Sequence, residues 1–297
     1  IAKLSISGKN VKASDVYDGE VDDLIDPEKV TQLVIIVIDK SGSMRSSYGN
    51  GLTRFQACQK FFIKFTEACY KFHTTSLYGS IMFTTSIEVR NKLNPLASDF
   101  SEKMIKEGEK PGGGTHMFTA MKCAADLLLA ANCIDESTGK RKFPNAELRE
   151  IVISDGNDGC HAPEMAKVSN FLLKNHIRID AIIVGRQVAK ELVYISRNSG
   201  GFAFYPRSVD EGFELFNKEE FFDINLRQFG PFHDPNITED KINGLHPLTI
   251  DDLDKEISTK PNIYADKSKV VTSPQFAVSE FEKARHEEIE KGVFVHQ

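Results

Sequence analysis

The chain has 297 residues and a formal net charge of −6; 40% of its residues are hydrophobic and 27% are charged. This composition is ordinary for a globular protein with a substantial core, and the length predicts one large domain or two small ones. The acidic balance, without any basic cluster, argues against nucleic-acid binding. No apolar run approaches the roughly 18 residues that predict a transmembrane segment.

The cysteines favour a cytoplasmic setting. Their number is odd, and most fall within predicted helices, so buried free thiols are expected rather than a disulfide framework. One glycosylation sequon, Asn236-Ile237-Thr238, leaves an extracellular setting open. The five cysteines are Cys58, Cys69, Cys123, Cys133 and Cys160.

The first regular element follows an acidic N-terminal segment, residues 1–29. Residues 33–38 are an unbroken apolar run, which predicts a central strand covered on both faces. Apolar residues then recur at steps of three and four from Phe55 to Phe72, which predicts an amphipathic helix. Thr53 and Gln56 fit a capping box at the start of this helix.

Strands and helices alternate through the middle of the chain. This alternation predicts an α/β fold: a doubly wound, mostly parallel six-stranded sheet, Rossmann-like, with helices on both faces. The first two of the following strands are close enough to form a hairpin. The predicted strands are 77–84, 87–89, 150–154, 179–184 and 202–205, and the predicted helices are 117–131, 163–175, 189–197 and 210–217.

The alternation stops near residue 218, so we divide the chain into 1–29, 30–218 and 219–297. Prolines punctuate the C-terminal extension, and only residues 275–291 predict a helix there. The extension carries too many large apolar residues for a solvated tail, which predicts burial against the domain or another subunit. These residues are Phe221, Phe222, Leu226, Phe229, Phe232, Phe276 and Phe281.

Three loops expected at the carboxyl edge of the sheet carry oxygen-bearing side chains. Asp39, Ser41 and Ser43 follow the first strand, Thr115 follows three glycines, and Asp155 follows the strand 150–154. Ligands of open α/β sheets bind beyond the carboxyl ends of the strands. Hydroxyl and carboxylate oxygens suit Mg²⁺, Mn²⁺ or Ca²⁺ rather than zinc. Five hard-oxygen side chains on three loops at one edge of the sheet therefore predict a divalent-metal site.

Other interpretations of these loops fit less well. Asp39 with its serines could be a helix cap. The glycines before Thr115 lack the Gly-Lys-Ser/Thr of a nucleotide P-loop. The loop from Asp155 to Gly159 has the wrong residues for a calcium-binding EF-hand, and no glycine pair frames a hydrolase serine. His116 could touch a ligand or act as a base, but a solvent-facing position at a helix start is favoured.

The stretch Asp39-Lys40-Ser41-Gly42-Ser43 resembles the D-x-S-x-S signature of the von Willebrand factor A (integrin I-like) family. Thr115 stands where the family places its distant threonine, and Asp155 where it places its second aspartate. The likeness covers roughly residues 30–217 and includes all five positions of the family's metal-ion-dependent adhesion site.

The resemblance implies a role for each residue. Ser41 and Ser43 would bind the ion directly, and Thr115 would join them in the ligand-bound state. Asp39 and Asp155 would act mostly through coordinated water. Such a site keeps one position open, and a partner protein's Asp or Glu would fill it.

These observations predict a non-enzymatic protein-binding domain that depends on a divalent metal, with Mg²⁺ as the first choice. One alternative is a structural scaffold subunit of a larger assembly, in which the metal serves stability and the C-terminal extension docks. A weaker alternative is a metal-dependent hydrolase, for which the sequence offers no visible catalytic base.

Overall fold

The computed structural model describes residues 25–222 and residue 247, except for 73–74, 97–98, 107, 135–136 and 157–161. The predicted helix 275–291 and the extension's apolar residues beyond Phe222 lie outside the described residues. Among the residues that are described, no helix combines the length and the apolar character needed to cross a membrane. The four described cysteines are free thiols: Cys58, Cys69 and Cys123, which are buried, and Cys133, which is exposed.

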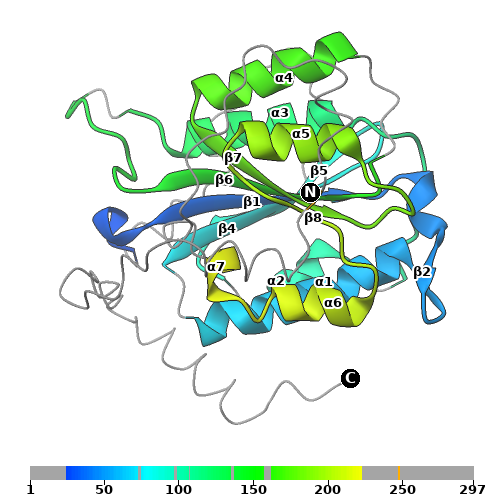
Figure 1. Cartoon of the computed structure of the whole chain (residues 1–297). Coiled ribbons are helices and arrows are strands. Elements are labelled where there is room, and N and C mark those ends of the chain that lie inside the picture. The colour runs from blue at the N-terminus through cyan, green and yellow to red at the C-terminus, as the bar shows by residue number, and fades with distance from the viewer. Residues whose placement is uncertain are drawn as a thin grey trace, which may run out of the picture.

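A six-stranded sheet forms the centre of the molecule, which confirms the predicted fold (Figure 1). All neighbouring strands are parallel except β5, which pairs antiparallel with β4 as the predicted hairpin. The strands in spatial order are β5 (Ile87–Asn94), β4 (Ser76–Phe83), β1 (Gln32–Asp39), β6 (Glu147–Ser154), β7 (Ile177–Ile183) and β8 (Ala203–Phe204).

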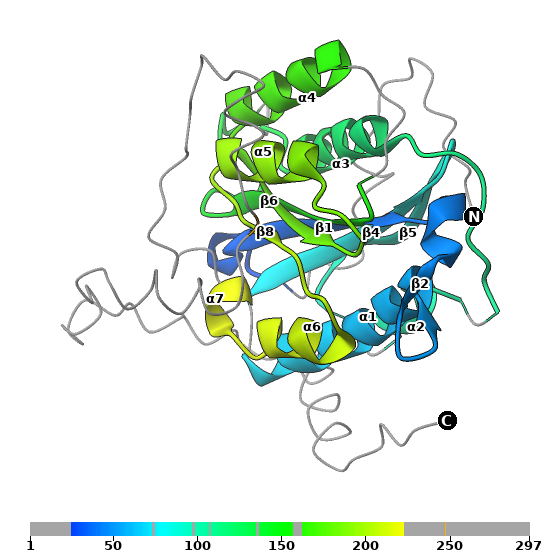
Figure 2. The same cartoon turned by 45° about the vertical axis from the view of Figure 1, so that its right-hand side comes forward.

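Helices cover both faces of this sheet, and the two views agree on which helix covers which face (Figures 1 and 2). Two hydrophobic cores result, one on each side. One layer holds α3 (Met117–Ala131), α4 (Ala162–Lys174) and α5 (Lys190–Asn198), and the other holds α1 (Arg54–Lys71), α2 (Phe100–Met104), α6 (Val209–Leu215) and α7 (Glu219–Phe222).

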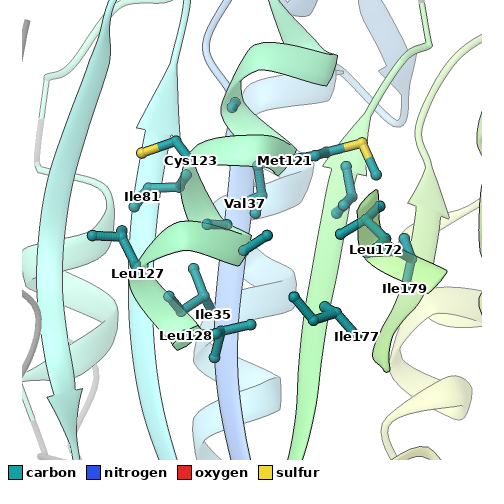
Figure 3. Packing of buried hydrophobic residues seen from close by; sticks show 14 of the residues in the cluster. Ile35, Val37, Ile81, Met121, Cys123, Leu127, Leu128, Leu172, Ile177 and Ile179 are labelled. Carbon is teal, nitrogen blue, oxygen red and sulfur yellow. The ribbon is translucent and has the colours of Figure 1, made fainter. Parts of the chain in front are cut away.

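Strand β1 supplies both cores because every residue in it is buried. Ile35 and Val37 belong to the core under α3, whereas Val34, Ile36 and Ile38 face the opposite core, since side chains alternate along a strand. Figure 3 shows Met121, Leu127 and Leu128 of α3 in the same packed cluster as these two strand residues. Burying each large apolar side chain contributes about 1.5–3 kcal/mol before entropy is counted.

Helix α1 begins at the predicted capping box. The Thr53 hydroxyl accepts a hydrogen bond from the Gln56 amide (3.2 Å), and the Gln56 side chain accepts one from the Thr53 amide (2.9 Å). Just before it, the short strands β2 (Ser47–Gly49) and β3 (Leu52–Thr53) form an antiparallel hairpin that the sequence analysis did not predict. The hairpin and the short 3₁₀ helix η4 (Gly42–Arg45) lead from the end of β1 into α1.

A buried ion pair anchors the last described helix. Arg149 of β6 pairs with Asp180 of β7 (Nε to Oδ2, 2.7 Å), and both side chains are 1% exposed. The same guanidinium donates to the carbonyl of Phe221 (2.6 Å), and Gln32 donates to the carbonyl of Phe222 (2.8 Å). Helix α7 follows residue 218, where we placed the domain division, and its two phenylalanines are buried in the same core as α1.

We expect Phe221→Ala to lower the free energy of unfolding by about 3–5 kcal/mol, because it leaves a cavity in a core that cannot fully collapse. Chemical denaturation of the full chain measures this. The control Ile63→Ala alters a side chain of α1 that is 54% exposed, and should cost less than about 1 kcal/mol. Equal effects of the two substitutions would show that α7 contributes nothing to the core.

Candidate functional site

The candidate site begins where two adjacent parallel strands end. Strand β1 ends at Asp39, and the neighbouring β6 ends at Ser154, directly before Asp155. The Asp39 carboxylate is fully buried and accepts two hydrogen bonds: from the Ser41 amide to Oδ1 (2.7 Å) and from the Ser154 hydroxyl to Oδ2 (2.7 Å). Two carboxylates thus follow neighbouring strands at the same sheet edge, and one is held in a fixed orientation.

The serine loop, residues 40–45, continues from Asp39. The hydroxyls of Ser41 and Ser43 lie 2.9 Å apart and share a hydrogen bond. Ser41 is buried, whereas Ser43 is half-buried and so lies closer to solvent. The Lys40 amide donates to the carbonyl of Phe83 at the end of β4 (2.8 Å), which ties the loop to the strand on the other side of β1.

The threonine loop, residues 111–116, lies against the serine loop. The Gly42 amide donates to the Gly113 carbonyl (3.0 Å), and the Gly112 amide donates to the Lys40 carbonyl (2.8 Å). Gly113 has a φ of +84°, a conformation that glycine adopts without steric cost. Thr115, two residues further on, is half-buried. The structure therefore brings the loop of the predicted threonine next to the predicted serines through backbone contacts.

Arg54, the first residue of α1, links Asp155 to the serine loop. Its Nη1 atom forms an ion pair with Oδ2 of Asp155 and also donates to the Ser43 carbonyl (3.3 Å). The side chains of Arg54 and Asp155 are 7% and 0% exposed. Neither Arg54 nor Ser154 was predicted from the sequence as a site residue. The available signals were their positions: Arg54 directly follows the capping Thr53, and Ser154 directly precedes Asp155.

A second charged network supports the serine loop from outside. Lys40 and Arg90 both pair with the Glu109 carboxylate, and Arg90 also pairs with Glu88 (2.9 Å). Burial alone would raise the pKa of Glu109, but the hydrogen bonds and charges of Lys40 and Arg90 outweigh it and hold that pKa below its usual 4.5. This network fixes residue 109, two positions before the threonine loop, to a side chain of the serine loop.

The environment of Asp39 disfavours its ionised form. Burial raises the pKa of Asp39 from 3.8 to about 6, and the nearby Asp155 carboxylate adds to the rise. Hydrogen bonds from Ser154 and Ser41 oppose it. Two carboxylates at one buried edge repel each other unless a cation lies between or beside them.

The donors at this edge differ from those of a carboxylate- or histidine-rich metal centre. Within the described part of the chain, no group of three or more His, Cys, Asp and Glu side chains is arranged to hold a metal ion. The candidate site instead combines two carboxylates with hydroxyls. His116, which follows Thr115, is exposed, and its amide donates to the Thr84 carbonyl (3.2 Å).

In metal-free protein, Asp39→Asn should raise the free energy of unfolding at pH 7.5 by about 3 kcal/mol, since it removes a buried charge whose pKa is raised by roughly two units. The folded state binds the proton more tightly than the unfolded state, so the contribution of Asp39 to stability falls as the pH rises from 3.8 to about 6. The substitution should therefore have little effect near pH 4.

Denaturation in EDTA at pH 4 and pH 7.5 measures both values. The control Asp210→Asn changes an exposed aspartate in the first turn of α6 and should lower stability by less than about 1 kcal/mol at either pH. A loss of stability at pH 7.5 on Asp39→Asn would contradict the claim that the ionised Asp39 carboxylate destabilises the metal-free fold.

Comparisons with known proteins agree with this architecture. The family model for the von Willebrand factor type A domain matches residues 34–218. Calcium-activated chloride channel regulator 1 is 28% identical over 177 residues in Bos taurus and 24% identical over 177 residues in Homo sapiens. Each match covers 59% of this chain and 17% of the relative.

A solved structure shares the fold at low sequence identity. The von Willebrand factor type A protein from Catenulispora acidiphila has a TM-score of 0.51 and 17% identity, with 65% of this chain and 42% of that chain covered. The sheet order, the helices on both faces and the match of the family model over most of the described residues lead to one conclusion. This chain belongs to the von Willebrand factor type A domain family.

Proposed function

We propose that this chain is a divalent-metal-dependent protein-binding domain whose metal site consists of Asp39, Ser41, Ser43, Thr115 and Asp155. Domains of this family generally mediate protein–protein interaction. One observation carries the proposal: the hydrogen bonds that join the serine loop to both the threonine loop and the Arg54–Asp155 pair. Loops that are far apart in sequence are thereby held at one edge of the sheet.

The chemistry of the donors supports Mg²⁺, with Mn²⁺ or Ca²⁺ as substitutes. The serine and threonine hydroxyls and the two carboxylates are all hard oxygen donors. Asp39 is oriented by hydrogen bonds from the Ser41 amide and the Ser154 hydroxyl, so this carboxylate does not have to reorganise from a solvated state. The bound ion would supply a Lewis-acidic position for an anionic oxygen.

The burial of these residues supports a ligand that approaches from the hydroxyl side. Asp39 and Asp155 are buried, whereas Ser43 and Thr115 are half-buried. An external carboxylate would therefore meet the hydroxyls before the protein's own carboxylates, from which it would be repelled. We infer that the partner presents an Asp or Glu side chain at the centre of the contact.

We propose binding rather than catalysis because both carboxylates already serve as hydrogen-bond acceptors. Both Asp39 oxygens accept hydrogen bonds, and Asp155 is paired with Arg54. A general base needs an oxygen available to the proton that it removes. This arrangement favours carboxylates that orient a metal ion over a general base, and it supports the binding function over a hydrolase.

Isothermal titration calorimetry should detect one Mg²⁺ site in the wild-type chain and none in Asp39→Ala or Ser41→Ala. Ser41→Ala removes a proposed direct ligand, and Asp39→Ala removes the carboxylate that accepts a hydrogen bond from the Ser41 amide. Ser47→Ala is the matched control, since this serine is exposed in the adjacent hairpin. It should bind Mg²⁺ as the wild type does. The same affinity in wild type and Asp39→Ala would refute the assigned site.

Thr115→Ala should weaken binding of the partner while the melting temperature changes by less than about 2 °C, because Thr115 is half-buried and serves the ligand-bound state. Parallel pull-downs in Mg²⁺ and in EDTA give the same test without a substitution. Partner binding that survives both Thr115→Ala and chelation would favour a scaffold whose metal serves only stability.

A further inference from the structure

Arg54 is a buried cation at a site expected to hold another cation. Its guanidinium contacts the Asp155 carboxylate and the Ser43 carbonyl, which belong to two of the three loops of the proposed metal site. The side chains of the ion pair are 7% and 0% exposed, so solvent screens this interaction little. Arg54 therefore already neutralises one of the two carboxylates.

The position of Arg54 in its helix is itself unfavourable. It is the first residue of α1, where the backbone amides carry partial positive charge, and a basic side chain is disfavoured at that end of a helix. The capping box of Thr53 and Gln56 satisfies the helix start without it. The start of the helix therefore does not explain why an arginine stands at position 54, whereas its ion pair with Asp155 does.

The structure also explains why a cation is needed without a metal. Asp39 and Asp155 follow adjacent strands and are both buried, and a buried carboxylate without a counter-charge strongly destabilises the fold. Arg54 supplies that charge. Asp39 instead is held by hydrogen bonds from Ser154 and the Ser41 amide.

We propose that Arg54 is a built-in counter-cation that stabilises the metal-free domain by pairing with Asp155 and thereby lowers the affinity of the site for its divalent ion. This inference rests on the proposed function and names a regulator of the same site. A guanidinium and a dication near one carboxylate repel each other. The ion pair of Arg54 with Asp155 therefore reduces the binding free energy of a divalent ion at this carboxylate, and a bound ion weakens the ion pair in turn. Arg54 is a positioning residue that keeps the domain folded between metal-binding events.

The proposal predicts opposite changes in stability and affinity. In EDTA, Arg54→Gln should lower the melting temperature by about 10 °C, because the Asp155 carboxylate stays buried without the positive charge of Arg54. In calorimetry the same variant should bind Mg²⁺ about tenfold more tightly, and Mg²⁺ should raise its melting temperature more than that of the wild type. If Arg54 had only a structural role, the Arg54→Gln variant would be less stable and would also bind Mg²⁺ more weakly than the wild type.

Two variants serve as controls. Arg54→Lys keeps the charge and should bind Mg²⁺ with an affinity within about threefold of the wild type, so the gain in Arg54→Gln comes from the lost charge. Arg149→Gln breaks a different buried ion pair, which joins the first half of β6 to the middle of β7, away from the residues of the proposed metal site. It should lower the melting temperature without changing the affinity for Mg²⁺.

The outcomes separate this inference from the proposed function. If the wild type binds Mg²⁺ and Arg54→Gln binds it equally or more weakly, the counter-cation role is wrong and the metal site stands. If neither protein binds Mg²⁺, both proposals fail. If Arg54→Gln folds only in Mg²⁺, the inference is supported, and if it fails to fold even in saturating Mg²⁺, the inference is overturned.

Discussion

The burial of two carboxylates at one edge of a parallel sheet is the constraint on which the rest of this structure depends. Asp39 and Asp155 follow adjacent strands, and water does not reach either side chain. Each must find its compensation within the protein, because an uncompensated buried charge would cost a large part of the stability of a domain of this size. The serine loop, Ser154 and Arg54 provide that compensation and so determine the shape of the site.

The interior of the same sheet meets a similar constraint with a different result. Arg149 and Asp180 are paired inside the core, and the guanidinium also binds carbonyls of α7. There the charges are fully compensated by the chain, so the pair joins strands to a helix and leaves nothing for a ligand. At the carboxyl edge, the hydroxyls of Ser43 and Thr115 remain half-buried near the paired carboxylate, and this difference is why we propose a binding site there and not at Arg149.

Local signals in the sequence predicted much of the fold. The capping box at Thr53 and the helix of residues 117–131 have the ends that the pattern indicated. Strand β6 begins at Glu147, three residues before the predicted start, because the charged residues Glu147 and Arg149 interrupt the apolar pattern although Arg149 is buried. These two residues pair with Arg178 and Asp180, which are distant in sequence, so no local pattern reveals them. The link between Arg54 and Asp155 spans 101 positions and was missed for the same reason.

The central claim is that the serine loop, the threonine loop and Asp155 together bind one divalent ion. The most direct measurement is an anomalous difference map from a crystal of the chain grown with Mn²⁺. The account predicts one peak at about 2.0–2.3 Å from the hydroxyl oxygens of Ser41 and Ser43, within the range of hard-cation ligand distances. A map without a peak near these hydroxyls would contradict the account, whether Mn²⁺ is bound elsewhere in the crystal or not at all.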